Sequence, residues 1–277
     1  MAEGHITYTE GNLTEAVVAR IRPDADARVA EVMSALIRHL HAFVREVRLT
    51  PEEWEQGVAF LSELGHWCDD KRQEVILLSD VLGVSMLVDA IANRHEASVS
   101  DTTVLGPFHR ENPPVMRNGD NLSPGAVGTP LEIDVTVRDQ DGRPLDGAQV
   151  DLWHTSAEGY YDSQIGDGAA HFMRGRFVTG PDGRVHCHTI CPASYPVPHD
   201  GPVGRVLAGM GRGPMRPTHV HFWIKKPGDR DLVTHIFKDG DPYLQEDAVF
   251  GVKASLVPDW SDGRLTYEFR IPRQDAA

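Results

Sequence analysis

The apolar residues between Asp26 and Arg48 recur at intervals of three and four positions. This spacing places them on one face of an α-helix. The stripe consists of Val29, Val32, Met33, Leu36, Ile37, Leu40, Phe43, Val44 and Val47. The default interpretation is a plain core helix. Because one long apolar stripe in a small helical region often needs a partner, the pattern also predicts a homodimer made through the N-terminal helices.

Two further helical patterns follow this stripe. The segment "TPEEWEQGVAFLSELGHW" has a strong start signal, because Thr50 can cap the helix, Pro51 suits its first turn and Glu53 completes a capping box. The segment "KRQEVILLSDVLGVSMLVDAIANR" predicts a third helix over residues 71–94, although Gly83 weakens its middle. The first hundred residues are therefore expected to be mostly helical.

The hydrophobic period changes to two in the second part of the chain, which is typical of half-buried strands. The alternating apolar positions are Leu131, Ile133, Val135, Val137, Ala148, Val150 and Leu152, with the turn-like "DQDGRPLDG" between them. Strand and turn signals continue to "LTYEFRI". We expect an α+β protein, with a helical dimerisation and linker region over residues 1–110 and a mainly antiparallel β-sandwich over residues 111–277. The Pro/Gly-rich stretch 112–130 is the predicted linker.

Charge and cysteine usage narrow the class of partner. The 277-residue chain has a formal net charge of −14, which argues against nucleic acid or an anionic membrane surface as the main partner. The first 28 residues lack a basic segment followed by an apolar core, and nowhere do eighteen apolar residues run together. Three cysteines do not suggest a disulfide framework. We therefore expect a cytoplasmic protein that acts on small molecules or proteins.

A pair of histidines in "RPTHVHFWI" is the first sign of chemistry. In a strand, residues i and i+2 leave the same face about 6.5–7 Å apart, so His219 and His221 can converge on one metal ion. A bare His-x-His also occurs by chance, as at His39 and His41 in a helical stretch, where the two side chains face apart.

Spacing alone does not choose the remaining ligands. The histidines of "VHCHT" form a rival pair, and several other side chains in the predicted sandwich could complete a site. The candidates are the carboxylates, His154, His171, His186, His188, Tyr160, Tyr161, Tyr195, Tyr243 and Tyr267.

Four segments in a fixed order carry a resemblance to a known family. "DLWHTSAEGYYD", "TICPASYPVPHDGP", "RPTHVHFWI" and "GDPYLQED" resemble the intradiol ring-cleaving dioxygenases, the catechol and hydroxyquinol 1,2-dioxygenase family, and the resemblance covers most of the chain. It implies that the sandwich carries a non-haem ferric ion bound by Tyr161, Tyr195, His219 and His221. By the same resemblance, the two histidines of "VHCHT" are solvated or hydrogen-bonded.

This ligand set suits the implied chemistry. Phenolates are hard anionic donors that favour Fe(III), and a trivalent cation lowers the tyrosine pKa from its usual value of about 10. The resemblance implies that a substrate with two adjacent hydroxyls displaces the Tyr195 phenolate, which accepts a proton, while Tyr161 stays bound. O2 then cleaves the ring between the hydroxyl-bearing carbons, without nicotinamide or flavin. Arg216 is expected to stabilise negative charge on the ring. His235 stands where catechol-cleaving members carry glutamine, so its role stays open.

The resemblance extends to the substrate pocket. The expected lining residues are Leu77, Asp80, Val104, Leu105, Gly106, Pro107, Phe108, Val197, Pro198, Arg216 and Val249. Catechol-cleaving relatives have an apolar residue or proline where Asp80 stands, whereas this aspartate resembles hydroxyquinol 1,2-dioxygenases and offers an acceptor to a third ring hydroxyl. The expected reaction converts hydroxyquinol and O2 to 3-hydroxy-cis,cis-muconate or its tautomer maleylacetate. Some relatives also hold a lipid at the helical interface.

Two alternatives stay open at this stage. A catechol or chlorocatechol dioxygenase would use the same iron site with another pocket. The segment "VRDQDGRPLDGAQVDLW" also resembles non-enzymatic β-sandwich modules, which have no reason to keep two tyrosines and His-x-His together.

Overall fold

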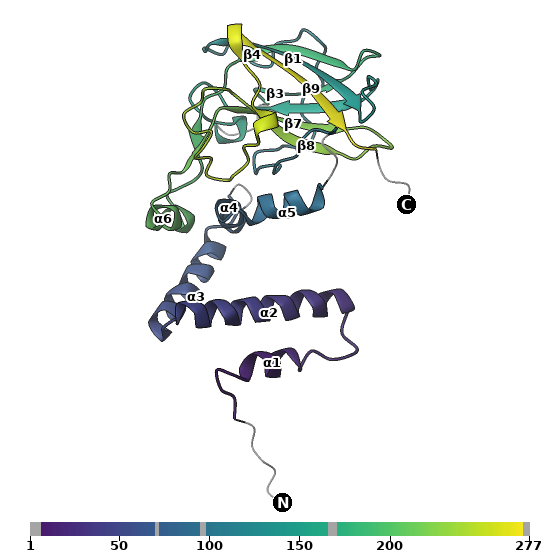
Figure 1. The fold of residues 1–277 in the computed structure, drawn as a ribbon. Helices are drawn as coiled ribbons and strands as arrows, with labels where there is room; N and C mark the ends of the chain where they lie inside the picture. The colour runs from purple at the N-terminus through teal and green to yellow at the C-terminus, as the bar shows by residue number, and fades with distance from the viewer. Residues whose placement is uncertain (1–6, 70–71, 95–97, 166–170, 274–277) are drawn as a thin grey trace, which may run out of the picture. The chain divides into compact units, whose positions relative to one another are not determined.

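The computed structural model describes residues 7–69, 72–94, 98–165 and 171–273. The chain divides into two compact units, Met1–Ser62 and Glu63–Ala277, whereas the hydrophobic pattern suggests a division at residue 110. Figure 1 shows the helices and strands of both units. The larger unit therefore includes helices that precede the change of period.

The first unit is built on a long helix with well-defined ends. It contains α1 (Leu13–Val18), α2 (Ala27–Val47) and the start of α3 (Pro51–His66). The Asp26 carboxylate caps α2 by accepting from Val29 N at 2.9 Å. The capping box of α3 is confirmed, because Thr50 N donates to Glu53 and Glu53 N donates to Thr50 Oγ1.

The apolar stripe of α2 is not buried within this chain. No residue of α2 is buried, and Val29, Leu36, Leu40 and Phe43 are 45–57% exposed. The plain core interpretation of this helix is therefore wrong for the single chain. Exposed apolar positions on one helix face form an unpartnered surface of the kind that marks an interaction site.

The single helix predicted over residues 71–94 is also wrong. Residue 71 lies outside the described residues, and the remainder forms α4 (Glu74–Val81) and α5 (Val84–Ala92). Gly83 has φ +73°, a left-handed conformation that ends one helix and lets the next begin at a 74° bend. Among the described residues no single helix is long and apolar enough to cross a membrane, although this bent pair matches by length and composition.

The second unit contains a β-sandwich of two sheets. Its strands are β1 (Pro130–Asp139), β2 (Gln149–Trp153), β3 (Arg174–Val178), β4 (Arg184–Ile190), β5 (Tyr195–Pro196), β6 (Met215–Arg216), β7 (His219–Lys225), β8 (Leu232–Phe237) and β9 (Arg264–Ile271). One sheet has the order β4-β1-β9 and the other β3-β2-β7-β8, and β5 pairs with β6. Among these named strands all pairings are antiparallel except β1 with β9. The predicted α+β fold with a mainly antiparallel sandwich is confirmed.

The core lies between the two sheets (Figure 1). The predicted inward positions of β1 and β2 are buried, including Ile133, Val135, Val137, Val150 and Leu152. Short elements connect the strands: α6 (Pro202–Gly209), η1 (Asp162–Gln164), η2 (Ala254–Leu256) and η3 (Ser261–Gly263).

The stretch 112–130 is not a free linker. Met116 N donates to Arg176 O at 2.8 Å, Gly119 N donates to His186 O, and Leu122 is 3% exposed within the core. This segment runs along β3 and β4 in an irregular conformation that its prolines and glycines permit. The linker prediction, which was based on composition alone, is therefore wrong.

The alternation of β7 places the functional side chains. Val220, Phe222 and Ile224 join the core, so His219 and His221 leave the opposite face. The register puts Trp153 of β2 and His235 of β8 directly opposite His221. Strand alternation and register alone therefore place several imidazole rings on one face of the four-stranded sheet.

Candidate metal centre and active site

Two phenols and two imidazoles converge above this face. Tyr161 Oη lies 3.1 Å from Tyr195 Oη and 2.8 Å from His221 Nε2. It is also 3.5 Å from His219 Nε2, and the two histidine Nε2 atoms are 3.2 Å apart. All four residues are buried. The structure therefore brings together the four side chains that the resemblance implies as ligands.

These distances fit one bound metal ion. A first-row ion holds nitrogen and oxygen ligands at about 2.0–2.2 Å, so ligand atoms around it lie about 2.8–3.6 Å from one another. His219 Nδ1–H donates to Pro217 O at 2.7 Å, which leaves the Nε2 lone pair directed into the cluster. His221 Nδ1 is buried and has no hydrogen-bond partner among the described residues. The donor set of two phenols and two imidazoles suits ferric iron.

The surroundings of His219 and His221 keep both imidazoles neutral, so each can bind a cation. Burial, reinforced by the Arg216 charge, lowers the pKa of His219 to about 3. Burial together with the neighbouring imidazoles of His235 and His219 lowers the pKa of His221 well below its usual value. Both rings are therefore neutral at pH 7, as metal ligands must be. Burial and the nearby Tyr195 raise the pKa of Tyr161, so the phenol stays protonated until a cation displaces its proton.

A cluster of three histidines offers a competing metal site. The ligand atoms of His219, His221 and His235 lie within 4.8 Å of one another. His235 Nδ1 lies 3.3 Å from Arg216 Nη2, and its Nε2 is buried with no hydrogen-bond partner among the described residues. The close donor contacts of Tyr161 with Tyr195 and His221, and of His219 with His221, favour the two-tyrosine, two-histidine set.

Local geometry brings Tyr161 to the cluster. Gly159 has φ +87°, and a Cβ there would stand 3.0 Å from Tyr195 Cβ, so the close approach of the two tyrosine segments requires glycine. The Phe108 ring stacks on Tyr161 at 4.4 Å. The next residue, Asp162, forms a buried ion pair with Arg174 that holds the turn.

The neighbours of His221 are equally tight. Its ring stacks on Trp153 at 4.6 Å with an interplanar angle of 14°. Gly106 has φ +77°, and a Cβ there would lie 3.2 Å from His221 Cε1. The loop that carries the expected pocket residues 104–108 therefore lies directly against this histidine.

The other candidate ligands lie elsewhere. Tyr160 is 55% exposed, and Tyr267 Oη donates to Ser255 O. His154 is buried with Nδ1 bonded to Thr155 O and Nε2 2.8 Å from Thr189 Oγ1. His171 Nδ1 lies 4.0 Å from Asp162.

The rival pair of "VHCHT" lies on the other sheet, in β4. His186 Nε2 is 2.9 Å from Glu132 Oε1, and the His186 and His188 rings meet edge to face. His188 is exposed. The pair is thus hydrogen-bonded and solvated, as expected.

A cavity of about 530 Å³ adjoins the cluster. Of the expected pocket residues, Leu77, Asp80, Val104, Gly106, Pro107, Phe108, Val197, Pro198, Arg216 and Val249 line it, together with Tyr195. Leu105 instead packs behind the wall, against the aromatic cluster of Trp153, Tyr161 and Tyr195. The cavity is also lined by residues that sequence reasoning missed: Arg72, Gln73, Glu74, Ile76, His109, Arg110, Ser163 and Gln164.

Asp80 is a buried acid in the cavity wall. Its residue exposure is 7%, and burial raises its pKa, whereas a hydrogen bond from Ser85 and the Arg216 charge lower it. Because burial removes water from this carboxylate, it is a strong acceptor for a hydroxyl that enters the cavity.

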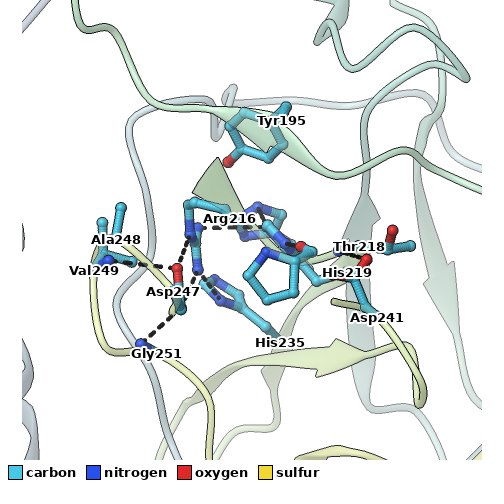
Figure 2. A network of polar contacts seen from close by, with 12 residues as sticks. Tyr195, Arg216, Thr218, His219, His235, Asp241, Asp247, Ala248, Val249 and Gly251 are labelled. Carbon is cyan, nitrogen blue, oxygen red and sulfur yellow. Dashed lines mark hydrogen bonds and ion pairs between the residues drawn. The ribbon is translucent and has the colours of Figure 1, made fainter. Parts of the chain in front are cut away.

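The motif "GDPYLQED" supplies two aspartates to the site, and sequence reasoning gave neither a role. Asp241 Oδ2 accepts from Ser194 Oγ at 2.7 Å. It also accepts from Thr218 N at 2.9 Å (Figure 2). Ser194 and Thr218 directly precede Tyr195 and His219 in the chain, so one carboxylate ties two proposed ligand segments together. The other aspartate, Asp247, contacts Arg216. The sequence feature that could have indicated a role for these two acids is their place in the motif GDPYLQED, which carries part of the family resemblance.

Comparisons with known proteins identify the family of this chain. A family model described as the catechol dioxygenase N terminus matches residues 26–100, and one described as dioxygenase matches residues 106–268. The chain belongs to this family, the intradiol ring-cleaving dioxygenases, and the non-enzymatic module is thereby excluded.

Several members of the family are similar over most of their length. The 6-chlorohydroxyquinol 1,2-dioxygenase of Cupriavidus pinatubonensis is 48% identical over 95% of this chain and 97% of the relative. The hydroxyquinol 1,2-dioxygenase of Nocardioides simplex is 48% identical over 90% and 84%. The solved structure of hydroxyquinol 1,2-dioxygenase from Pseudomonas putida DLL-E4 superposes with a TM-score of 0.90 at 41% identity, over 96% of this chain and 99% of that one.

Proposed function

We propose that this enzyme cleaves hydroxyquinol, benzene-1,2,4-triol, with O2 between its adjacent hydroxyl-bearing carbons. The products are 3-hydroxy-cis,cis-muconate and its tautomer maleylacetate. The observation that carries the proposal is the convergence of Tyr161, Tyr195, His219 and His221 beside a cavity whose wall holds the buried Asp80. Similar proteins from several organisms bear the name hydroxyquinol 1,2-dioxygenase, which supports the same substrate.

In this proposal the four residues hold a non-haem Fe(III). When bound, the ion draws electron density from a chelated diol and so makes the ring carbon reactive toward O2. Tyr195 lines the cavity, whereas Tyr161 is fully buried beneath Phe108. Tyr195 Oη is therefore the phenol oxygen within reach of a substrate in the cavity, and it would accept a hydroxyl proton there. Tyr161 stays in position and keeps its negative charge near the site.

The remaining groups orient the ring and exclude water. Arg216 carries a permanent charge at the cavity wall, where it stabilises negative charge that develops on the ring. Val197 and Val249 supply apolar walls, which lower the local dielectric and strengthen that interaction. Asp80 accepts a hydrogen bond from the hydroxyl that distinguishes hydroxyquinol from catechol.

A visible spectrum of the purified protein tests this function. We expect a charge-transfer band from iron-bound phenolate that shifts when hydroxyquinol is added without oxygen, and ring cleavage when air is admitted. Hydroxyquinol should be turned over faster than catechol or chlorocatechol. A colourless protein would refute the iron site, and faster turnover of catechol would refute the substrate while leaving intradiol cleavage standing.

We further propose a homodimer, with residues 1–110 as its dimerisation and linker region and residues 111–277 as the catalytic β-sandwich. The exposed stripe of α2 supports this arrangement, because a second copy of the same stripe would bury it symmetrically. The resemblance also implies a lipid at this interface, and native mass spectrometry of the purified dimer would reveal one. The three cysteines are unpaired, which supports a cytoplasmic location.

Introducing a charge into the stripe should disrupt this dimer. We expect Leu36→Glu or Leu40→Glu to convert most of the protein to monomer in light scattering at micromolar concentration, because the charge would be buried without a partner. Ala42→Glu is the matched control, since Ala42 is exposed on the same helix away from the stripe. A monomeric wild type would remove the proposal.

A further inference from the structure

The guanidinium of Arg216 contacts Asp247 along one edge and His219 at its other end (Figure 2). Nε donates to Asp247 Oδ1 at 3.1 Å, and Nη2 lies 3.5 Å from Asp247 Oδ2 and 3.3 Å from His235 Nδ1. Nη1 instead lies 3.4 Å from His219 Nε2, beside the proposed ligand cluster. The Asp247 edge therefore leaves Nη1 directed toward the place where substrate binds.

Asp247 is itself fixed by its own loop. Its Oδ2 accepts from Gly251 N at 2.9 Å, its Oδ1 lies 3.4 Å from Val249 N, and the residue is 5% exposed. A Cβ at Gly251 would stand 3.1 Å from Asp247 Oδ2 and 3.2 Å from Arg216 Nη2. Glycine at position 251 therefore leaves space for the ion pair, which a larger side chain would crowd. Phe250 takes a left-handed φ of +60° to close this turn. The same loop presents Val249 to the cavity.

A buried arginine without a fixed anion would find another partner. Arg216 is 3% exposed, and burial opposes its charge, yet the Asp247 carboxylate together with the Tyr195 and Tyr161 phenols raises the Arg216 pKa. Two carboxylates line the same cavity: Glu74, which pairs with Arg72, and Asp80, whose pKa the Arg216 charge lowers. Without Asp247, the guanidinium would turn toward Asp80, leave the ring and occupy the acceptor meant for substrate.

We propose that Asp247 is the positioning residue that holds Arg216 toward the substrate ring and keeps it from pairing with Asp80. One carboxylate thus sustains both charge stabilisation and substrate choice without contacting substrate. This inference rests on the roles proposed above for Arg216 and Asp80. It adds a specificity determinant outside the pocket wall.

The test compares Asp247→Asn with Arg216→Gln and the double variant. Asparagine keeps the size of the side chain but sets an amide N–H against N–H donors. We expect Asp247→Asn to lower kcat for hydroxyquinol by about 10- to 100-fold, as for loss of a charged hydrogen bond, and to raise KM by a smaller factor because Arg216 then competes for Asp80. In the Arg216→Gln background the same change should alter kcat by no more than about twofold. The Asp247→Asn protein should match wild type in its iron content and in its spectral shift on anaerobic titration with hydroxyquinol.

A rescue experiment separates positioning from general support of the fold. Asp247→Asn should lower the preference for hydroxyquinol over catechol, and adding Asp80→Ala should raise catechol turnover above that of Asp247→Asn alone, because Arg216 then loses its competing partner. Glu246→Gln, an exposed acid in the same loop, is the matched control and should behave as wild type.

The outcomes distinguish this inference from the proposed function. If Arg216→Gln kept full activity, the role of Arg216 itself would fail. If Arg216→Gln were impaired while Asp247→Asn matched wild type, the positioning role would be overturned. Loss of iron in Asp247→Asn, or an equal loss of activity in the Arg216→Gln background, would overturn it as well, because Asp247 would then act apart from Arg216.

Discussion

Tyr161→Phe should yield a protein with little bound iron, no visible charge-transfer band and turnover lowered by more than about 100-fold. Losing a partner of a metal ligand typically costs about 10- to 100-fold, and Tyr161 is proposed as a ligand itself. Its Oη is the atom closest to the other donors, 2.8 Å from His221 Nε2 and 3.1 Å from Tyr195 Oη. Phenylalanine keeps the stacking on Phe108 and removes only this oxygen.

His219→Ala and His221→Ala should also lose iron, whereas His235→Gln should retain it. This contrast decides between the two-tyrosine, two-histidine set and the three-histidine cluster, because only the latter includes His235. Iron content by elemental analysis and the visible spectrum measure the result. His186→Ala and His188→Ala are matched controls, since they belong to the other sheet and should leave iron and colour intact. Loss of iron from the controls would show that the ligand assignment is wrong.

Asp80→Ala is the second change with a large expected effect. If the buried carboxylate accepts the third hydroxyl of hydroxyquinol, its loss should lower kcat/KM for that substrate by about 1–3 kcal/mol, or roughly 5- to 150-fold. Catechol has no such hydroxyl, so its turnover should stay unchanged or improve. Sites that leave a polar group unpaired against the wrong substrate can discriminate by up to about 10⁴–10⁵.

The position of Asp80 makes alanine a better test than proline. Asp80 lies within α4, one residue before its end, and its carbonyl accepts from Gly83 N at 2.9 Å. Proline there would disturb the helix as well as remove the carboxylate. Iron content should match wild type in Asp80→Ala. Equal losses for both diols would mean that Asp80 supports the site in general rather than the choice of substrate.

Hydrophobic periodicity determined the class of fold in advance. The stripe of α2, the capping box at Thr50 and the alternation in β1 all depend on residues close in sequence, so they could be predicted without a structure. The same locality explains His219 and His221, because strand geometry alone puts both on one face. Tyr161 and Tyr195 have no such local signal. They were identified only through the resemblance of their motifs, since each lies in or beside an irregular loop.

Contacts between distant segments decided the rest. Gly83 turned a predicted single helix into two, because its left-handed backbone lets α4 end with Asp80 at the cavity. The stretch 112–130 joined the sandwich because its backbone pairs with β3 and β4, a property that composition does not encode. The pairing of His235 with His221 followed from the β7–β8 register.

The polar network around the site belongs wholly to the tertiary structure. The chain order by itself determined that Asp241 and Asp247 share one motif, and that each is an acid capable of accepting hydrogen bonds. Only the folded chain brings Asp241 to the residues before Tyr195 and His219, and Asp247 to Arg216. The physical reason is that a hydrogen bond forms between atoms about 3 Å apart, whatever their separation along the chain. Sequence therefore supplies the groups, and packing selects which of them meet.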